Sequence, residues 1–457
     1  MRLSALAGKR VAVWGYGREG KAALSVLRRK FPGQPVTLFC SAAEAAGIGR
    51  DGEGIEIVTT APDAAALSVF DIVIKSPGIG PYREPYVSAE KAGVRFTSGT
   101  AIWFAENANS KAICVTGTKG KSTVTALIAH LLRAGGKRVA LAGNIGLPLL
   151  ELLEPYVEPD WWVIELSSFQ TRDFGGAPTV AVVNNLLEEH LDWHGDADRY
   201  RADKLKILGD GSDGVAVLNA GDRATASIRT PRKIIWFNSN NGWHARDDSI
   251  FRGDEEILPL AQIPLPGLHN AHNVCAALAA IDAAGIDART LAQHVATFKA
   301  LPHRLQRLGV RDDIEYVNDS ISTTPYAAIE ALRSVGGKAT AILVGGFDRG
   351  VDWQPFVDFV ALHPPRAVIT MGANGDAITA ALAKVEQHGF ELVSSHTLAE
   401  AFARARASMR EGGVILLSPG APSFDQFKDY AERGREFARL AGFDPAAIAQ
   451  IEGMGIA

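Results

Sequence analysis

The sequence predicts an α/β protein of several domains, and three observations support this fold class. Short β-branched runs such as Val11–Trp14 recur along the chain, and each is followed by a glycine-bearing loop and a helical stretch. The chain of 457 residues is too long for one compact core. Hydrophobic residues make up 47% and charged residues 21%, with 46 glycines, which is typical of a globular protein with many tight turns.

The charge balance and the cysteines exclude several classes of protein. The chain carries 47 basic and 51 acidic residues, so its net charge of −4 predicts neither a nucleic-acid partner nor an anionic membrane partner. No apolar run approaches the roughly 18 residues of a membrane span, and no signal peptide is evident. Cys40, Cys114 and Cys275 are widely scattered and have no metal or redox spacing. We therefore expect a cytoplasmic protein.

The first block, residues 1–99, predicts a Rossmann-like domain. Val11–Trp14 runs into Gly15-Tyr16-Gly17-Arg18-Glu19-Gly20, a G-x-G-x-x-G pattern, and further strands are expected at Val36–Cys40 and Asp71–Lys75. An NAD site also needs an acidic residue at the end of the second strand, where this chain has Cys40-Ser41. A nicotinamide-dependent oxidoreductase is therefore disfavoured, and the loop is either a diphosphate site or a plain turn.

The second block, residues 100–303, predicts a P-loop ATPase-like domain. Gly117-Thr118-Lys119-Gly120-Lys121-Ser122-Thr123 fits G-x-x-G-K-[ST], two residues shorter than a Walker A loop. Gly117 and Gly120 let backbone amides converge on phosphate oxygens, Lys121 adds a positive charge, and Ser122 can ligate Mg²⁺. An apolar strand before the loop and an amphipathic helix after it favour nucleotide binding over a chance match.

Several polar residues follow strands or open helices in the same block. Glu165 ends the strand Trp161–Glu165, where either a Mg²⁺ ligand or a capping glutamate is expected. From spacing alone, His190 is a loop histidine and Lys204 a solvated helix lysine. Asn270 and Asn273 lie three apart on one helical face, where they could read a base or cap the helix. The third block, residues 304–457, predicts a C-terminal Rossmann-like domain.

These runs, in this order, resemble the Mur ligases, the ATP-dependent amino-acid ligases of peptidoglycan synthesis. The resemblance covers nearly the whole chain, and the first domain and three of the runs are similar to the MurD-type glutamate ligases within that family. The matching runs are Gly117–Thr123, Gly143–Gly146, Glu165–Gln170, His190, Tyr200–Lys204, Gly267–Asn273, Leu301–Arg304, Asn318–Ser320 and Asp425–Phe427.

The resemblance implies an ATP-dependent ligase with two Mg²⁺ ions that joins glutamate to UDP-N-acetylmuramoyl-L-alanine through an acyl phosphate. The implied catalytic residues are Lys121, His190, Lys204 and Arg304, with Lys204 carboxylated by CO₂. The implied metal ligands are Ser122, Glu165, His190 and Lys204. ATP contacts fall on Gly117, Thr118, Lys119, Gly120, Lys121, Ser122, Thr123, Asn270, Asn273, Arg304 and Asp319. Contacts to the UDP substrate fall on Gly15, Gly17, Arg18, Glu19, Ser76, Pro77, Gly78 and Asn144.

Two departures from the usual pattern concern the amino acid that is added. A lysine usually lies two residues after the aspartate of the run "NDSKAT", whereas this chain has Ile321 there, and Arg349 stands where a lysine is common. An arginine fork and a lysine point charge bind carboxylates differently. The combination resembles a branch that adds L-glutamate, after which a separate epimerase inverts it. We expect Thr323, Arg349 and Ser423 to contact the glutamate.

Other hypotheses lead to different functions. An ordinary MurD-type enzyme would add D-glutamate, and a folylpolyglutamate synthase would share the ligase chemistry but lack the N-terminal UDP-binding domain. A non-enzymatic nucleotide-binding regulator would be indifferent to the loss of Lys204.

Overall fold

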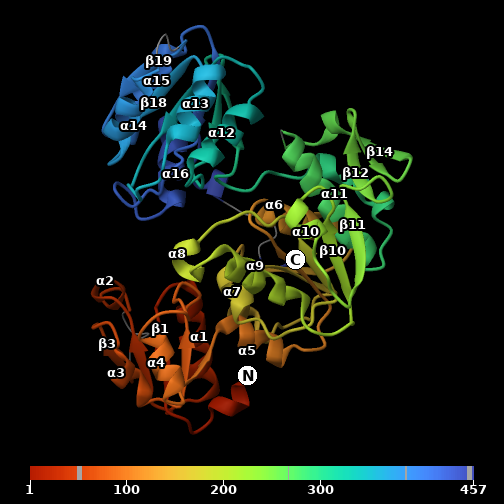
Figure 1. Cartoon of the computed structure of the whole chain (residues 1–457), viewed down its shortest axis with the longest axis vertical. Helices are drawn as coiled ribbons and strands as arrows, with labels where there is room; N and C mark the ends of the chain where they lie inside the picture. The colour runs from red at the N-terminus through yellow and green to blue at the C-terminus, as the bar shows by residue number, and fades with distance from the viewer. Residues whose placement is uncertain (49–53, 266, 386–388, 450–454) are drawn as a thin grey trace. The chain divides into compact units, whose positions relative to one another are not determined.

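A computed structural model describes residues 1–48, 54–265, 267–385, 389–449 and 455–457 (Figure 1). The chain forms two compact units. Unit 1 comprises Met1–Ile263, Leu268–Phe298 and Gly453–Ala457, and unit 2 comprises Pro264–Gly267 and Lys299–Glu452. Three sheets, each largely parallel and flanked by helices, confirm the predicted α/β fold class. The domain bounds at residues 99/100 and 303/304 stay predictions.

The first sheet of unit 1 is a five-stranded parallel sheet in the order β3-β2-β1-β4-β5. Its elements are the strands β1 (Val11–Trp14), β2 (Val36–Phe39), β3 (Ile55–Val58), β4 (Ile72–Lys75) and β5 (Arg95–Thr97), and the helices α1 (Arg18–Lys30), α2 (Ala42–Ala45), α3 (Ala64–Ser68) and α4 (Tyr86–Lys91). The strand order reverses between β1 and β4, and such a reversal is the position where α/β sheets bind ligands. The loops after these two strands meet there, with the Ser76 hydroxyl donating to the Gly15 carbonyl at 3.2 Å.

The second sheet of unit 1 has ten strands in the order β14-β13-β12-β11-β10-β9-β6-β8-β7-β21. Its strands are β6 (Ala112–Thr116), β7 (Val139–Gly143), β8 (Trp161–Glu165), β9 (Val180–Val183), β10 (Val215–Asn219), β11 (Lys233–Phe237), β12 (Trp243–Arg246), β13 (Ser249–Arg252), β14 (Glu255–Pro259) and β21 (Gly455–Ile456). The strands β6 to β9 are buried along their whole length, because helices cover both faces of a parallel sheet. Among the described residues, the antiparallel pairs are β12–β13 and β13–β14 toward one edge of the sheet and β7–β21 at the other edge.

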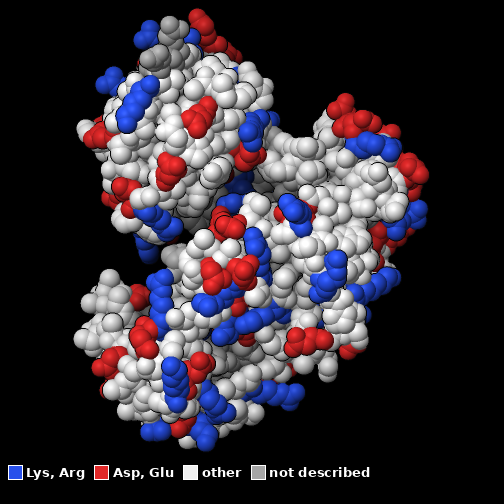
Figure 2. Space-filling view, viewed as in Figure 1, with Lys and Arg blue, Asp and Glu red and all other residues white. Residues whose placement is uncertain are grey.

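Seven helices accompany this sheet, and α6 and α11 pack against one another beside it. They are α5 (Gly99–Glu106), α6 (Lys121–Ala134), α7 (Ser168–Arg172), α8 (Leu191–His194), α9 (Ala197–Leu205), α10 (Arg223–Ala226) and α11 (Leu268–Ala283). No helix in the described part of the chain is long and apolar enough to cross a membrane. Lys and Arg side chains intermingle with Asp and Glu on the face drawn in Figure 2, as the near-neutral charge balance predicts.

Unit 2 contains a six-stranded sheet in the order β15-β16-β20-β17-β18-β19, parallel except for β15. The strands are β15 (Gln306–Arg311), β16 (Ile314–Asn318), β17 (Thr340–Val344), β18 (Ala367–Thr370), β19 (Glu391–Ser394) and β20 (Gly413–Leu417). The helices are α12 (Pro325–Ser334), α13 (Gln354–Leu362), α14 (Gly375–Leu382), α15 (Leu398–Ser408) and α16 (Tyr430–Leu440). Two apolar clusters, one on each face of the sheet, form its core.

Candidate active site

The shortened glycine loop joins the buried strand β6 to the helix α6. Gly117 has φ of 151° and Gly120 has φ of 79°, conformations that favour glycine. A Cβ at Gly120 would lie 2.4 Å from both Asn184 Nδ2 and Asn273 Oδ1. The first amides of a helix have no intrahelical partner, so the start of α6 presents N–H groups and the positive end of the helix dipole. The loop therefore has the geometry of an anion site.

Asparagine side chains support the loop from beneath. Asn184 Nδ2 donates to the Lys119 carbonyl and to Asn273 Oδ1, both at 3.0 Å. Asn273 in turn donates to Asn270 Oδ1 at 3.1 Å. Asn185 Oδ1 accepts the backbone N–H groups of Thr118 at 3.0 Å and of Lys119 at 2.7 Å.

The structure thus brings Asn270 and Asn273 of α11 to the glycine loop. Asn184 and Asn185 were missed by the sequence analysis, although two adjacent amides at the carboxyl end of a buried strand are a usable signal. Through these hydrogen bonds the two side chains hold the backbone of Thr118 and Lys119.

Lys204 lies under the loop and is only 2% exposed, so the solvated-lysine interpretation is wrong. Its Nζ donates to the Gly117 carbonyl at 2.7 Å, and the hydroxyl of Tyr200, on the same helix, lies 2.8 Å from Thr118 Oγ1. Burial and then the nearby Lys121 charge lower the pKa of Lys204 well below its ordinary value, although two carboxylates oppose this shift. Helix α9 therefore carries a buried amine with a strong tendency to be neutral.

Glu165, at the end of β8, is buried with 1% exposure and is not a surface residue. Its Oε1 accepts a hydrogen bond from Asn144 Nδ2 at 2.9 Å. Its Oε2 is buried and has no hydrogen-bond partner in the described part of the chain. A buried carboxylate oxygen without a partner is costly unless a cation or a donor occupies the position beside it, so Glu165 fits a metal ligand.

His190 is the N-cap residue of the short helix α8 and has the left-handed conformation, with φ of 54°. Its ring lies 4.9 Å from the Phe169 ring, between centroids. No group of three His, Cys, Asp or Glu side chains that could hold a metal ion occurs among the described residues. A metal at this site would therefore need other oxygen donors, which the Ser122 hydroxyl, nucleotide phosphates and a carboxylated lysine could supply.

The G-x-G-x-x-G loop lies in unit 1 together with the segments that carry Asn144 and Glu165. The Arg18 guanidinium donates to the Gly146 carbonyl, and Glu19 Oε1 accepts from Gln170 Nε2 at 3.0 Å. Burial raises the pKa of Glu19, which the hydrogen bond from Gln170 partly offsets. A Cβ at Gly20 would lie 1.9 Å from the Gly15 carbonyl oxygen, so the turn needs glycine there.

The loop after β4, Ser76-Pro77-Gly78, also lies in unit 1 and meets the G-x-G-x-x-G loop between β1 and β4. Ser76 contacts Gly15, and the Gly78 carbonyl accepts a hydrogen bond from Trp193 Nε1 at 3.0 Å. The predicted UDP-substrate residues Gly15, Gly17, Arg18, Glu19, Ser76, Pro77, Gly78 and Asn144 are thus neighbours along two strand ends and the facing edge of the second sheet.

Unit 2 holds the remaining predicted site residues. Asp319 Oδ1 accepts from the Leu305 amide at 3.1 Å and its Oδ2 from the Ser418 hydroxyl at 2.8 Å. Burial raises the pKa of Asp319 to about 6, although these hydrogen bonds and the nearby Arg304 charge lower it. Ser423 is buried and its hydroxyl has no hydrogen-bond partner among the described residues, whereas Arg349 is exposed and Thr323 half-buried.

Arg433 is a further residue of this region that the sequence did not reveal. It is buried, and its guanidinium donates to the carbonyls of Ser320, Ala421 and Pro422 at 2.9, 3.0 and 3.2 Å. Burial lowers the pKa of Arg433 to about 10. The side chain therefore fixes the loops that carry Thr323 and Ser423. On sequence alone it is indistinguishable from a solvated helix arginine.

Comparison with known proteins identifies the family. Residues 115–281 match the family model of the Mur ligase middle domain. A UDP-N-acetylmuramoyl-L-alanine–L-glutamate ligase of Xanthomonas campestris pv. campestris is 52% identical over 467 residues, covering all of both chains. A protein of the same name from Salinispora tropica is 38% identical over 451 residues, covering 96% of this chain and 98% of that one.

Solved structures share the fold at low sequence identity. The UDP-N-acetylmuramate-alanine ligase MurC of Thermotoga maritima has a TM-score of 0.61 at 19% identity, covering 95% of this chain and 99% of that chain. MurF of Acinetobacter baumannii has a TM-score of 0.57 at 18% identity, covering 84% and 86%. With full-length relatives at this identity, the predicted resemblance is confirmed: the chain belongs to the Mur ligase family.

Proposed function

We propose that the protein is an ATP-dependent ligase that joins L-glutamate to UDP-N-acetylmuramoyl-L-alanine in the cytoplasm, as a step of peptidoglycan precursor synthesis. The observation that carries this proposal is the end-to-end match, at 52% identity, to relatives that bear this name. We assign residues 1–99 to binding of the UDP substrate, 100–303 to ATP, and 304–457 to glutamate.

Mur ligases use ATP and Mg²⁺. The loop Gly117–Thr123 and the start of α6 would bind the phosphates through backbone amides, with Lys121 and Arg304 adding positive charge. Asn270 and Asn273 would contact the nucleotide, and Asp319 the ribose. The ligands Ser122, Glu165, His190 and Lys204 would hold Mg²⁺, two ions by the family resemblance, which would neutralise charge on the transferring phosphoryl group.

Lys204 becomes a suitable oxygen ligand once it is carboxylated. The lone pair of a neutral amine attacks the carbon of CO₂, one amine proton leaves, and the product is an anionic carbamate with two oxygens. The lowered pKa of Lys204 favours the neutral amine that this step needs. The buried position excludes most of the water that would compete for the amine.

The chemistry follows from the weakness of a carboxylate as an acyl donor. The alanyl carboxylate of the substrate attacks the γ-phosphorus of ATP, ADP leaves, and an acyl phosphate forms. The glutamate amine then attacks the acyl carbon, and phosphate leaves as the amide bond forms. Lys121 and Arg304 stabilise the negative charge in both steps, and Asn144 orients the acyl end of the substrate.

We assign the glutamate contacts to Thr323, Arg349 and Ser423. The buried, unpartnered hydroxyl of Ser423 and the bidentate fork of Arg349 suit the two carboxylates of glutamate. Ile321 in place of a lysine and Arg349 in place of another resemble the branch that adds L-glutamate, and on this resemblance we favour L-glutamate over D-glutamate. Since the product then carries the L configuration, we propose that a separate epimerase inverts it afterwards.

The test is ATP-dependent phosphate release by the purified protein with UDP-N-acetylmuramoyl-L-alanine, run in parallel with L-glutamate and with D-glutamate. Turnover with L-glutamate alone is expected. Turnover with D-glutamate alone would assign the D-glutamate reaction instead, and release with neither amino acid would refute a glutamate ligase.

A further inference from the structure

Three buried side chains form a continuous hydrogen-bond chain in unit 1 that the proposed reaction does not use. His194 has no exposed surface, and its Nδ1 lies 2.8 Å from Asp203 Oδ2 while its Nε2 lies 3.0 Å from Ser168 Oγ. A carboxylate only accepts hydrogen bonds, so Nδ1–H donates to Asp203 and the Ser168 hydroxyl donates to Nε2. The chain therefore has one direction, from Ser168 through His194 to Asp203.

The order Ser-His-Asp is that of a hydrolase triad, but the surroundings do not suit nucleophilic catalysis. Ser168 is 2% exposed and is the first residue of α7, and the His194 ring is enclosed by Phe169, Trp193 and Tyr200. A nucleophile must reach a substrate carbon and a neighbouring oxyanion site, which this enclosure prevents. The hydrogen-bond chain of Ser168, His194 and Asp203 is thus better suited to holding segments of the backbone in place.

Each member of the chain lies close in sequence to one predicted metal ligand. Ser168 is three residues after Glu165, His194 is four residues after His190, and Asp203 directly precedes Lys204. Glu165 ends β8, His190 begins α8, and Lys204 lies on α9, so the ligands come from three separate elements. The hydrogen-bond chain joins α7, which begins three residues after the end of β8, to α8 and α9.

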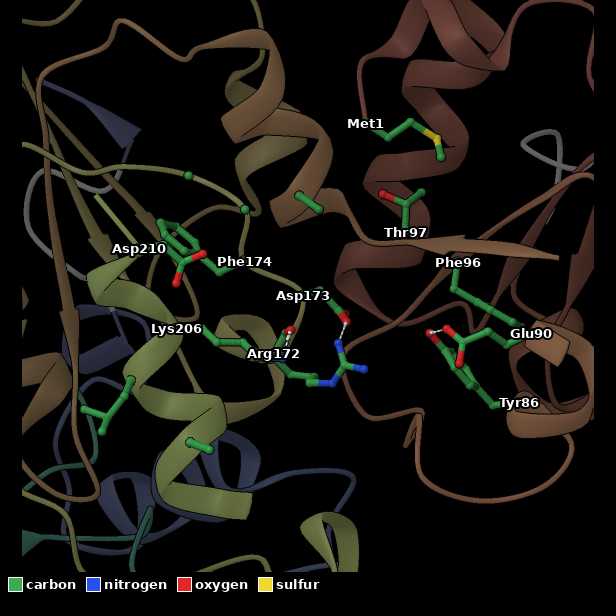
Figure 3. Close-up of a pocket in the computed structure, with 16 residues that line it drawn as sticks. Met1, Tyr86, Glu90, Phe96, Thr97, Arg172, Asp173, Phe174, Lys206 and Asp210 are labelled. Carbon is green, nitrogen blue, oxygen red and sulfur yellow. Dashed lines mark hydrogen bonds and ion pairs between the residues drawn. The ribbon is translucent and has the colours of Figure 1, made fainter. Parts of the chain in front are cut away.

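The hydrogen-bond chain is anchored to the first sheet of unit 1. The Tyr82 hydroxyl, on the loop after β4, donates to Asp203 at 2.7 Å, and Arg172 Nε donates to the Tyr82 oxygen at 2.9 Å. Burial alone would raise the pKa of Asp203, but the hydrogen bonds from His194 and Tyr82, together with the Lys206 and Arg172 charges, lower that pKa. Arg172 and Lys206, which also lie within 4 Å of the Asp203 carboxylate, line a cavity of about 880 Å³ (Figure 3).

We propose that Ser168, His194 and Asp203 are positioning residues that hold Glu165, His190 and Lys204 in register for Mg²⁺. The proposal rests on the metal site of the proposed function. Ligands on separate elements lose affinity when their backbones shift by a fraction of an ångström, so residues that orient them are often worth ten- to a hundred-fold in metal affinity.

The experiment measures Mn²⁺ binding by electron paramagnetic resonance, with a non-hydrolysable ATP analogue present. The variants are Ser168→Ala, His194→Gln and Asp203→Asn, each close in size to the native residue. His244→Gln is the matched control, because His244 is also a buried histidine of unit 1, on β12, with Nδ1 3.2 Å from the Gly242 carbonyl. Urea unfolding midpoints are measured for the three variants, the control variant and the wild-type protein.

We expect the Mn²⁺ dissociation constant to rise about ten-fold or more in the three variants and to change less than about two-fold in the control. Tyr82→Phe, which removes one half-buried hydroxyl, should give a smaller rise and serves if a core variant fails to fold. Unchanged Mn²⁺ affinity, with unfolding midpoints lowered as in the control, would refute the positioning role. Because Mn²⁺ binding needs neither glutamate nor the UDP substrate, failure of ligase turnover is a separate result that concerns the proposed function alone.

Discussion

Substitution of Gly120 by alanine tests whether the short loop depends on the asparagines beneath it. At φ of 79°, a Cβ costs about 1–2 kcal/mol in backbone strain. The same Cβ would lie 2.4 Å from Asn184 Nδ2 and from Asn273 Oδ1, so these side chains must separate. The hydrogen bonds from Asn184 to Lys119 and to Asn273 are each worth about 1 kcal/mol. We therefore expect Gly120→Ala to destabilise unit 1 by about 3–4 kcal/mol.

The control variant Gly136→Ala separates the cost of backbone strain at a positive φ from the cost of the steric clash with the asparagines. Gly136 follows the same helix α6 with φ of 75°, but a Cβ there would meet nothing within 4 Å. This control should lose only about 1–2 kcal/mol in urea unfolding and retain wild-type affinity for an ATP analogue in calorimetry. Gly120→Ala should bind the analogue at least ten-fold more weakly. Equal behaviour of the two variants in both assays would show that the asparagines do not set the loop.

Three further changes probe the predicted site residues. Lys204→Ala should reduce turnover at least about 100-fold, whereas the affinity for an ATP analogue should change by no more than a few-fold. The reason is that the lost group would ligate metal rather than bind the nucleotide. Retained turnover would favour a structural role for Lys204. Asp319 has a pKa of about 6 against an ordinary 3.8, so its contribution to the stability of unit 2 is full below about pH 4 and falls by about 3 kcal/mol as the pH rises through 6. Hydrogen exchange of the β16–β20 amides should show this fall, and Asp319→Asn should abolish it. Arg349→Ala should raise the KM for glutamate about ten-fold or more and leave the KM for ATP unchanged. The control is Arg333→Ala, because the native Arg333 guanidinium pairs with Glu330, and it should change neither KM.

The buried parallel strands were predictable because their signal is local. Val11–Trp14 is continuously apolar and Trp161–Glu165 is apolar up to its last residue, and these runs form β1 and β8 with the predicted bounds. The strands β12 to β14 were not predicted, because their sequences, WHAR, SIFR and EEILP, mix polar and apolar residues without a continuous apolar run.

The candidate site was predictable only where the motif itself carries chemistry. The glycine loop indicated its own conformation, but the burial of Lys204 depends on how α9 packs under that loop. The partnership of His194 with Ser168 and Asp203 joins residues up to 35 positions apart, and no periodicity connects them. Such contacts are decided by tertiary packing, which one sequence does not display.

The asparagine support of the glycine loop also limits how this enzyme could be re-engineered. Asn184 joins the loop to α11, and Asn185 accepts two of its amides. A phosphate loop of another length would not present the Thr118 and Lys119 backbone groups at the positions to which these side chains bind, so both asparagines would have to change with it. Loop length and the two asparagines are therefore a single module, which can be exchanged or conserved only as a whole.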